Sequence, residues 1–163
     1  MLTIQYHPIG IIHTPYKTPE GTPIQPSASK GEKATIEVFE KYAEGLTDLL
    51  GFSHIYLIYH FHLSRKFSLT VKPFLDDVSH GLFATRAPAR PNAIGLSVVE
   101  LIGKKENTLR VKYIDVLDGT PLLDIKPYVP GFDVHKVHKL GWMEKRIKDL
   151  DGAKDDGRFA KMD

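Results

Sequence analysis

The feature that most constrains the fold is a series of short β-branched and aromatic runs, separated by turns rich in glycine and proline, through the first 130 residues. Such runs are typical of antiparallel strands, and almost no helical pattern interrupts them. Many strands at short spacing predict a mainly β protein, a single small antiparallel β-barrel. Neither the Rossmann glycine fingerprint nor a P-loop is present, so a nucleotide-binding α/β fold is not expected.

The most regular run is His54–His62, which we expect to be a central strand covered on both faces. The other runs predict strands over residues 3–14, 34–39, 69–71, 81–85, 94–102, 108–116 and 121–125.

Three segments depart from the strand pattern. Residues 15–33 contain several prolines and glycines and predict a long loop, while residues 41–50 predict a short amphipathic helix or turn. Apolar residues recur at helical spacing in residues 136–150, so an amphipathic helix is expected there. We therefore divide the chain into a barrel, residues 1–133, and a helical, charged C-terminal extension of the same domain, residues 134–163.

The composition limits the chemistry and the location. The 163 residues are 42% hydrophobic and 26% charged, which suits one globular domain. The chain has no cysteine, which excludes disulfides, thiolate metal sites and a cysteine nucleophile. No run approaches the ~20 apolar residues of a membrane span, so we expect a cytoplasmic protein without a membrane partner. The net charge of +2 permits a nucleic-acid partner without requiring one.

Two pairs of histidines raise the question of a metal. His60 and His62 lie two apart on a predicted strand, and His135 and His138 have helical spacing. A zinc site needs three or four converging ligands, and no third ligand is recognisable nearby, so no metal is expected. We interpret the second pair as a solvated face and expect one of the first pair to meet a ligand or a polar network.

Arg86 and Arg90 lie on either side of an Ala-Pro-Ala turn and precede Pro91 and Asn92. One alternative is structural, with Arg86 in a salt bridge. The other is functional, because a guanidinium binds carboxylates and phosphates with paired hydrogen bonds and the prolines reduce the entropy lost on binding. We favour the functional alternative.

Asp124 and Lys126 place an acid and a base in a strand that otherwise suits burial, just after the turn that begins at Asp118. An unpaired buried charge is costly. Asp124 is therefore expected to pair with Lys126 or an arginine, to face a ligand, or to do both.

Four segments, in order along most of the chain, together resemble the TsaA-like family, whose best-known members are TrmO-type tRNA methyltransferases. They are Pro8–Tyr16, Gly51–His62, Gly81–Ser97 and Asp118–Tyr128. The chain departs from the family at Ala93, where proline is usual, and it lacks the longer C-terminal extension of some bacterial members, a difference that bears on tRNA docking.

The resemblance implies a barrel that binds S-adenosylmethionine as a homodimer and methylates N6 of N6-threonylcarbamoyladenosine at position 37 of threonine tRNA. The implied cofactor-binding residues are Pro26, Ser27, Ala28, His62, Leu63, Arg86, Leu96, Leu122, Leu123, Asp124 and Ile125. Because the N6 nitrogen is a poor nucleophile, we expect a proton acceptor beside it, first Asp124 and second His62. Arg90, or Arg86 if it does not contact the cofactor, is expected to bind the threonyl carboxylate or a phosphate, with Asn92 and Lys126 as further substrate-binding residues.

Two alternatives remain open at this level. One is a methyltransferase of the same fold with a different acceptor. The other is a module that binds the cofactor or RNA without catalysis, for which the stacking and charged candidates are Tyr56, Tyr59, Phe61 and Lys66. Most aromatic residues at such spacing belong to the core.

Overall fold

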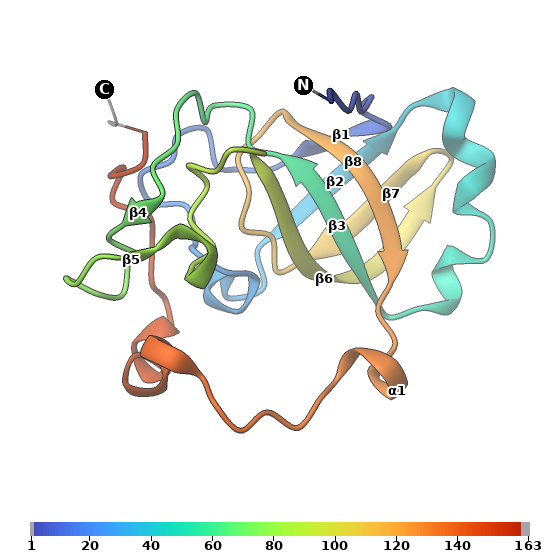
Figure 1. The fold of residues 1–163 in the computed structure, drawn as a ribbon. Coiled ribbons are helices and arrows are strands. Elements are labelled where there is room, and N and C mark those ends of the chain that lie inside the picture. The colour runs from blue at the N-terminus through green and yellow to red at the C-terminus, as the bar shows by residue number, and fades with distance from the viewer. Residues whose placement is uncertain (1, 161–163) are drawn as a thin grey trace.

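The computed structural model describes residues 2–160. Within this part of the chain, six strands close into an antiparallel barrel in the order β1, β2, β7, β6, β3, β8 (Figure 1). They are β1 (Gly10–His13), β2 (Lys33–Val38), β3 (His54–His60), β6 (Ile94–Lys105), β7 (Thr108–Lys112) and β8 (Thr120–Pro127). Closure pairs every strand on both sides and leaves no open sheet edge. The predicted barrel is confirmed.

The core fills the inside of the barrel because side chains alternate along each strand. In β2 every second residue is buried, and Ile36 is fully enclosed. β3 alternates in the same way between buried and half-buried residues. The expectation that both faces of this strand are covered is therefore wrong, since a strand of a closed antiparallel barrel presents one face to the core and the other outward.

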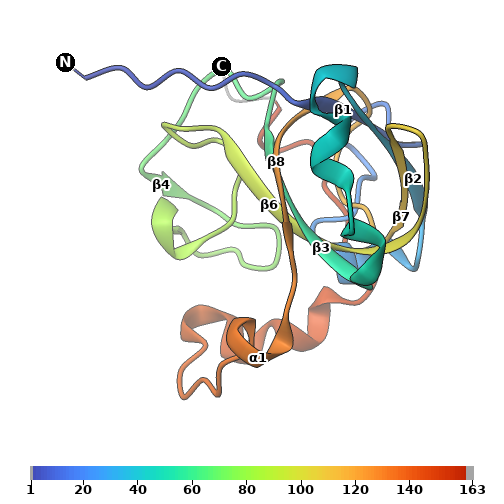
Figure 2. The same cartoon turned by 90° about the vertical axis from the view of Figure 1, so that its right-hand side faces the viewer.

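Three strand predictions differ most from the structure. The strand predicted over residues 108–116 ends at Lys112, before Tyr113, whose φ is 64°. The N-terminal strand covers only Gly10–His13, where β2 and β8 provide partners, and the preceding residues lead away from the barrel (Figure 2). The segment 81–85 is not a strand: β5 (His80–Gly81) pairs with β4 (Thr70–Val71) in a separate small sheet, and a 3-10 helix, η4 (Leu82–Ala84), follows. In this segment Leu82 is buried against Val71 and Ala87, whereas Phe83 is exposed, so the apolar composition does not indicate strand pairing.

Short 3-10 helices occupy the connections. They are η1 (Pro26–Ser29) in the long N-terminal loop, and η2 (Glu40–Leu46) and η3 (Leu49–Gly51) between β2 and β3. The predicted loop and the predicted helix or turn are both confirmed.

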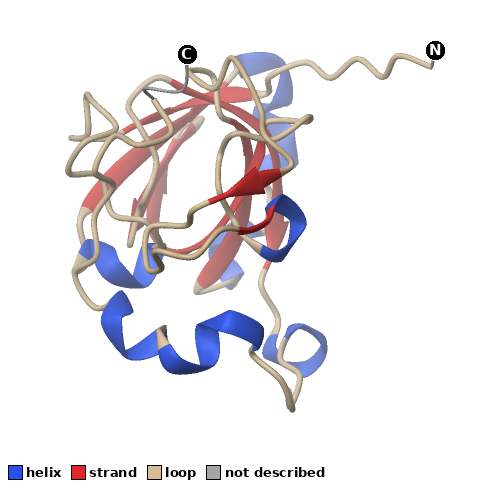
Figure 3. Ribbon diagram, turned by 60° about the vertical axis from the view of Figure 1, so that its left-hand side comes forward, coloured by secondary structure: helices blue, strands red, loops and turns tan. Residues whose placement is uncertain are grey.

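The C-terminal segment is helical only in part. A short α1 (Pro130–Asp133) is followed by extended chain and then by η5 (Gly141–Lys145) and η6 (Ile147–Leu150), which Figure 3 shows in blue outside the barrel. One continuous helix over residues 136–150 was therefore the wrong expectation. Gly141 has a φ of 59°, a left-handed conformation that interrupts a right-handed helix.

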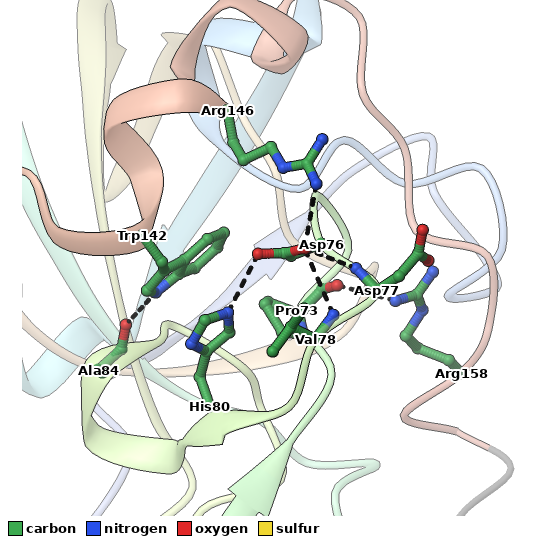
Figure 4. Close-up of polar contacts among 9 residues, drawn as sticks. All are labelled: Pro73, Asp76, Asp77, Val78, His80, Ala84, Trp142, Arg146 and Arg158. Carbon is green, nitrogen blue, oxygen red and sulfur yellow. Dashed lines mark hydrogen bonds and ion pairs between the residues drawn. The ribbon is translucent and has the colours of Figure 1, made fainter.

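A polar cluster attaches this segment to the rest of the molecule (Figure 4). Asp76 accepts hydrogen bonds from His80 at 3.1 Å and Arg146 at 3.2 Å. The His80 ring stacks on Trp142, with centroids 4.9 Å apart, and the indole N–H donates to the Ala84 carbonyl at 2.8 Å. The hydrogen bond from His80, aided by backbone amides, lowers the pKa of Asp76 and keeps it charged.

Beyond this cluster, the chain returns to the long N-terminal loop. The amide of Gly21 donates to the Asp155 carbonyl at 2.8 Å, and the amide of Asp155 donates to the Thr22 carbonyl at 2.7 Å. Arg158 then donates to the Pro73 carbonyl at 2.8 Å. These bonds hold residues 153–160 beside residues 19–25. No helix within residues 2–160 has the length and apolar character that crossing a bilayer requires.

Candidate functional site

A cavity of about 340 Å³ lies at one end of the barrel, where β3 ends and β6 and β8 begin. Phe74 and residues from five segments line it, within the ranges 19–25, 59–64, 85–96, 115–120 and 155–160. The volume is in the range of about 300–1,000 Å³ that is usual for small-molecule sites. The barrel thus forms the floor of a ligand-sized cavity, and the loops and the C-terminal segment form its walls.

A chain of three polar groups reaches the cavity from the barrel interior. The Tyr59 hydroxyl lies 3.0 Å from the Ser97 hydroxyl, which donates to the Asp115 carboxylate at 2.6 Å. Tyr59 and Ser97 point inward from neighbouring strands. Gly95 makes room for them, because a Cβ at this position would overlap the Tyr59 ring.

Burial is the main cause of the pKa shifts of Asp115 and Tyr59 in this row of hydrogen-bonded groups. It raises the pKa of Asp115 to about 7, although the Ser97 hydrogen bond opposes the shift. Burial also raises the pKa of Tyr59, and the charge of Asp115 adds to that effect. Near neutral pH, Asp115 is therefore close to the point at which a ligand can change its protonation.

The two arginines differ in their contacts. Arg86 donates to the side-chain oxygen of Gln25 at 3.0 Å, a neutral partner and not the salt bridge of the structural alternative. Arg90 donates to the carbonyls of Thr85 at 3.0 Å and Ala87 at 3.4 Å. Both line the cavity, but Arg90 also holds the turn between them in shape.

His62 lies just beyond the end of β3 and lines the cavity, whereas His60 is exposed at the end of the strand. Burial, together with the charge of His60, lowers the pKa of His62. The imidazole is therefore neutral near pH 7 and offers one nitrogen as an acceptor. No group of three or more potential ligands with metal-binding geometry occurs in the part of the chain that the structure describes.

The structure brings together part of the expected site. The cavity is lined by His62, Leu63, Arg86, Arg90 and Leu96. The other expected residues, Pro26, Ser27, Ala28, Asn92, Leu122, Leu123, Asp124, Ile125 and Lys126, do not line it.

Asn92 precedes β6, and the other residues that do not line the cavity fall into two groups. Pro26, Ser27 and Ala28 form η1, directly after the cavity-lining Gln25. The second group belongs to β8, where Leu122 is enclosed in the barrel core.

Asp124 forms the predicted ion pair with Lys126, with 2.8 Å between the charged atoms. Ile58 of β3 pairs with Leu96 on one side and with Asp124 on the other. Neighbouring strands are about 4.8 Å apart, so Asp124 lies about 10 Å across the sheet from Leu96.

Sequence reasoning missed several residues that line the cavity, notably Asp115, Asp155, Phe74 and Phe159. Asp115 follows Ile114 and precedes Val116, and an acid among apolar residues is the same signal that identified Asp124. No comparable signal marks Asp155 or Phe159, because they reach the cavity only through the backbone bonds of the C-terminal segment.

A closed antiparallel barrel with a mixed polar and apolar cavity at one end defines a small-molecule-binding protein of the barrel class. Residues 11–134 match the family model of the tRNA-methyltransferase O N-terminal domain, and the chain belongs to this family. The resemblance to the TsaA-like family is thereby confirmed.

The relatives agree with this assignment. A probable S-adenosyl-L-methionine-binding protein of Pyrococcus abyssi is 57% identical over 158 residues, covering 97% of this chain and 86% of that protein. The tRNA (adenine(37)-N6)-methyltransferase of Homo sapiens is 35% identical over 133 residues, covering 77% of this chain and 30% of that protein. The crystal structure of TrmO from Pseudomonas aeruginosa superimposes with a TM-score of 0.72 at 37% identity, covering 86% of this chain and 63% of that one.

Proposed function

We propose that this protein is an S-adenosylmethionine-dependent methyltransferase that modifies N6 of adenosine 37 in tRNA, with N6-threonylcarbamoyladenosine of threonine tRNA as the acceptor. The observation that carries the proposal is the cavity itself. It gathers His62, Leu63, Arg86 and Leu96, four of the expected cofactor-binding residues, from separate segments of the chain.

The residues of the cavity fit the chemical groups of this cofactor. Leu63, Leu96 and Phe74 provide apolar surface for the adenosine part, and Arg86 provides a fork of N–H donors for the methionyl carboxylate. Asp115 provides a negative charge for a cationic group. When bound, the cofactor supplies an activated methyl group with its own leaving group. The protein therefore has to exclude water, orient the partners and compensate charge.

His62 is the better placed of the two candidate proton acceptors. Its neutral imidazole lines the cavity, whereas Asp124 is on the outer face of β8 and already binds Lys126. Asp124 and Lys126 are close enough to Leu96 to contact an acceptor nucleoside that extends from the cavity mouth. We therefore assign the removal of the N6 proton to His62 and contact with the tRNA to Asp124, Lys126 and Asn92.

This assignment predicts different effects for two substitutions. His62→Gln should lower the single-turnover rate of methyl transfer by about 100-fold, the usual contribution of a positioned base. Asp124→Asn should raise the tRNA concentration needed for half-maximal rate while leaving the rate at saturation within about threefold. Equal losses of saturated rate in both variants would contradict the assignment.

The arginines are assigned from their contacts. Among the residues that the structure describes, the Arg86 side chain donates a hydrogen bond to the neutral amide of Gln25, which a carboxylate of the cofactor can replace. One guanidinium nitrogen of Arg90 donates hydrogen bonds to two carbonyls of its own turn. We propose that its other N–H groups donate to the threonyl carboxylate or to a phosphate.

We also propose a homodimer. Leu63, Phe83 and Leu96 are more than half exposed in the single chain. Leu63 and Leu96 line the cavity, and the Phe83 ring lies 5.7 Å from the guanidinium of Arg90, which also lines it. Apolar side chains in such a position favour a partner surface. Light scattering coupled to size-exclusion chromatography should give twice the mass of the chain, and the monomer mass would contradict this part of the proposal.

The decisive experiment uses the full chain and labelled S-adenosylmethionine. Total tRNA from cells with and without the threonylcarbamoyl modification is incubated with the protein, and the methylated nucleoside is identified. Label only in the modified tRNA supports the proposal. Label in both samples points to another acceptor, and label in neither favours a binding module. Lys105→Ala, at the end of β6 where Lys105 pairs with Thr108 of β7, is a control that should keep full activity.

A further inference from the structure

We propose that Asp115 recognises the positive charge of the sulfonium and so makes the site prefer S-adenosylmethionine over its neutral thioether product, S-adenosylhomocysteine. This inference rests on the proposed function, because it concerns the same cavity. It assigns Asp115 a role in ligand discrimination that the resemblance does not imply.

The first argument is position. Asp115 lies between Ile114 and Val116, both buried in the barrel core, and its carboxylate lines the cavity floor. A charged group in such surroundings loses hydration that the protein must replace. The side chain is thus placed at the one boundary where a ligand can approach it.

The second argument is orientation. The Ser97 hydroxyl donates to Asp115 at 2.6 Å and can accept from Tyr59 at 3.0 Å, so two buried side chains hold the carboxylate in place. Hydrogen bonds arranged in series strengthen one another in a medium of low dielectric constant. The carboxylate is preorganised and needs little rearrangement when a ligand binds.

The third argument is the missing counter-charge. Within residues 2–160, no lysine, arginine or histidine forms an ion pair with Asp115. Arg86 exerts a favourable charge effect on it, but this guanidinium is bonded to Gln25 instead. Buried charges in proteins are usually paired, so a cavity-facing carboxylate without a partner suits a cationic ligand group.

The surroundings favour a sulfonium over an ammonium group. An ammonium carries three N–H donors, each of which needs an acceptor. Near Asp115 the cavity presents Val116, Leu117 and the Tyr59 ring, and the hydroxyl of Thr120 is already bonded to the Leu117 carbonyl at 2.7 Å. A sulfonium has no donors and is stabilised by a negative charge and an aromatic ring, as this wall provides.

The test measures affinity rather than activity. Isothermal titration calorimetry at pH 8 gives the dissociation constants of S-adenosylmethionine and S-adenosylhomocysteine. They are measured for the unmodified protein, for Asp115→Asn and for Asp155→Asn. Asparagine keeps the shape and an acceptor oxygen but not the charge. We expect Asp115→Asn to weaken S-adenosylmethionine binding by about tenfold or more and S-adenosylhomocysteine binding by less than about threefold.

Asp155→Asn is the matched control, because Asp155 is a second carboxylate that lines the cavity, but it belongs to the C-terminal segment and accepts from the Gly157 amide at 2.6 Å. It should change both affinities by the same factor. The inference would be overturned if Asp115→Asn lost affinity for both ligands equally or lost none. It would also be overturned if Asp155→Asn lost affinity for S-adenosylmethionine selectively.

Ser97→Ala keeps the inference testable if Asp115→Asn does not fold. This substitution removes the hydrogen bond from Ser97 to the Asp115 carboxylate. It should weaken the binding of S-adenosylmethionine by about threefold and leave the binding of S-adenosylhomocysteine unchanged. An equal effect on both compounds would again overturn the role of Asp115. If the unmodified protein binds neither compound, the proposed function fails as well. If it binds both and the variants show no selectivity, only this inference fails.

Discussion

Asp115→Asn should also make the unliganded protein more stable, by an amount that depends on pH. The pKa of this carboxyl is about 7 in the folded protein, against 3.8 as the ordinary value. Between these values the folded state holds a proton that the unfolded state has released. The free energy of unfolding therefore falls as the pH rises through this window and stays low above it.

The magnitude follows from the shift. About three pKa units correspond to about 4 kcal/mol, at about 1.4 kcal/mol for each unit. The Asp115 side chain is only partly buried, which reduces this value, and asparagine also loses part of the hydrogen bond from Ser97. We expect the stability of Asp115→Asn relative to the unmodified protein to rise by about 2 kcal/mol between pH 5 and pH 8.

Urea denaturation followed by circular dichroism, at both pH values and without ligand, measures this difference. Groups common to both proteins cancel in the comparison, so the change reports on Asp115. A difference that is the same at pH 5 and pH 8 would refute the reasoning. So would a variant that becomes relatively less stable at pH 8.

Three further predictions follow from the packing around the cavity. Phe159→Ala should weaken S-adenosylmethionine binding by about tenfold in calorimetry, because the ring forms part of the cavity wall. A loss of stability without a loss of affinity would show that the ring serves only the fold. Gly95→Ala should lower the free energy of unfolding by about 1–3 kcal/mol in urea, because the new methyl group overlaps the buried ring of Tyr59. The pKa of Asp76 is lowered in the folded protein, so the contacts it makes are retained above its ordinary value and lost as the pH falls below it. The fluorescence of Trp142, the one tryptophan of the chain, should therefore change below about pH 4, and Asp76→Asn should show the altered signal already at pH 7.

Much of the fold could be predicted, because period-two alternation is a local property of each strand. Residues 34–39 and 54–62 differ from the true strands by only one or two residues. Errors occur where pairing partners decide the outcome. Residues 3–8 have the composition of a strand but form no ladder with β2 or β8, and the backbone pairing begins at Ile9, whose amide donates to the Leu122 carbonyl at 2.8 Å. Residues 82–84 turn into a 3-10 helix beside β5.

The site could be predicted in part. His62, Arg86 and Leu96 were expected from motifs and line the cavity, whereas Asp124 lies across the sheet from it. A motif places residues along the chain but does not say which face of a closed barrel each one occupies. The register shift in β8, where Tyr59 pairs with Leu122 but the adjacent Ile58 pairs with Asp124, is a tertiary feature of this kind.

By itself, the sequence determined the strand periodicity, the absence of thiol chemistry and the motifs of the family. These are properties of residue type and spacing, and they are present before the chain folds. Only the tertiary structure decided that Tyr59, Ser97 and Asp115 form one hydrogen-bonded chain and that the C-terminal segment reaches the cavity. The reason is that closing the barrel brings distant strands together, and burial, which depends on all of them, sets the electrostatics of the site.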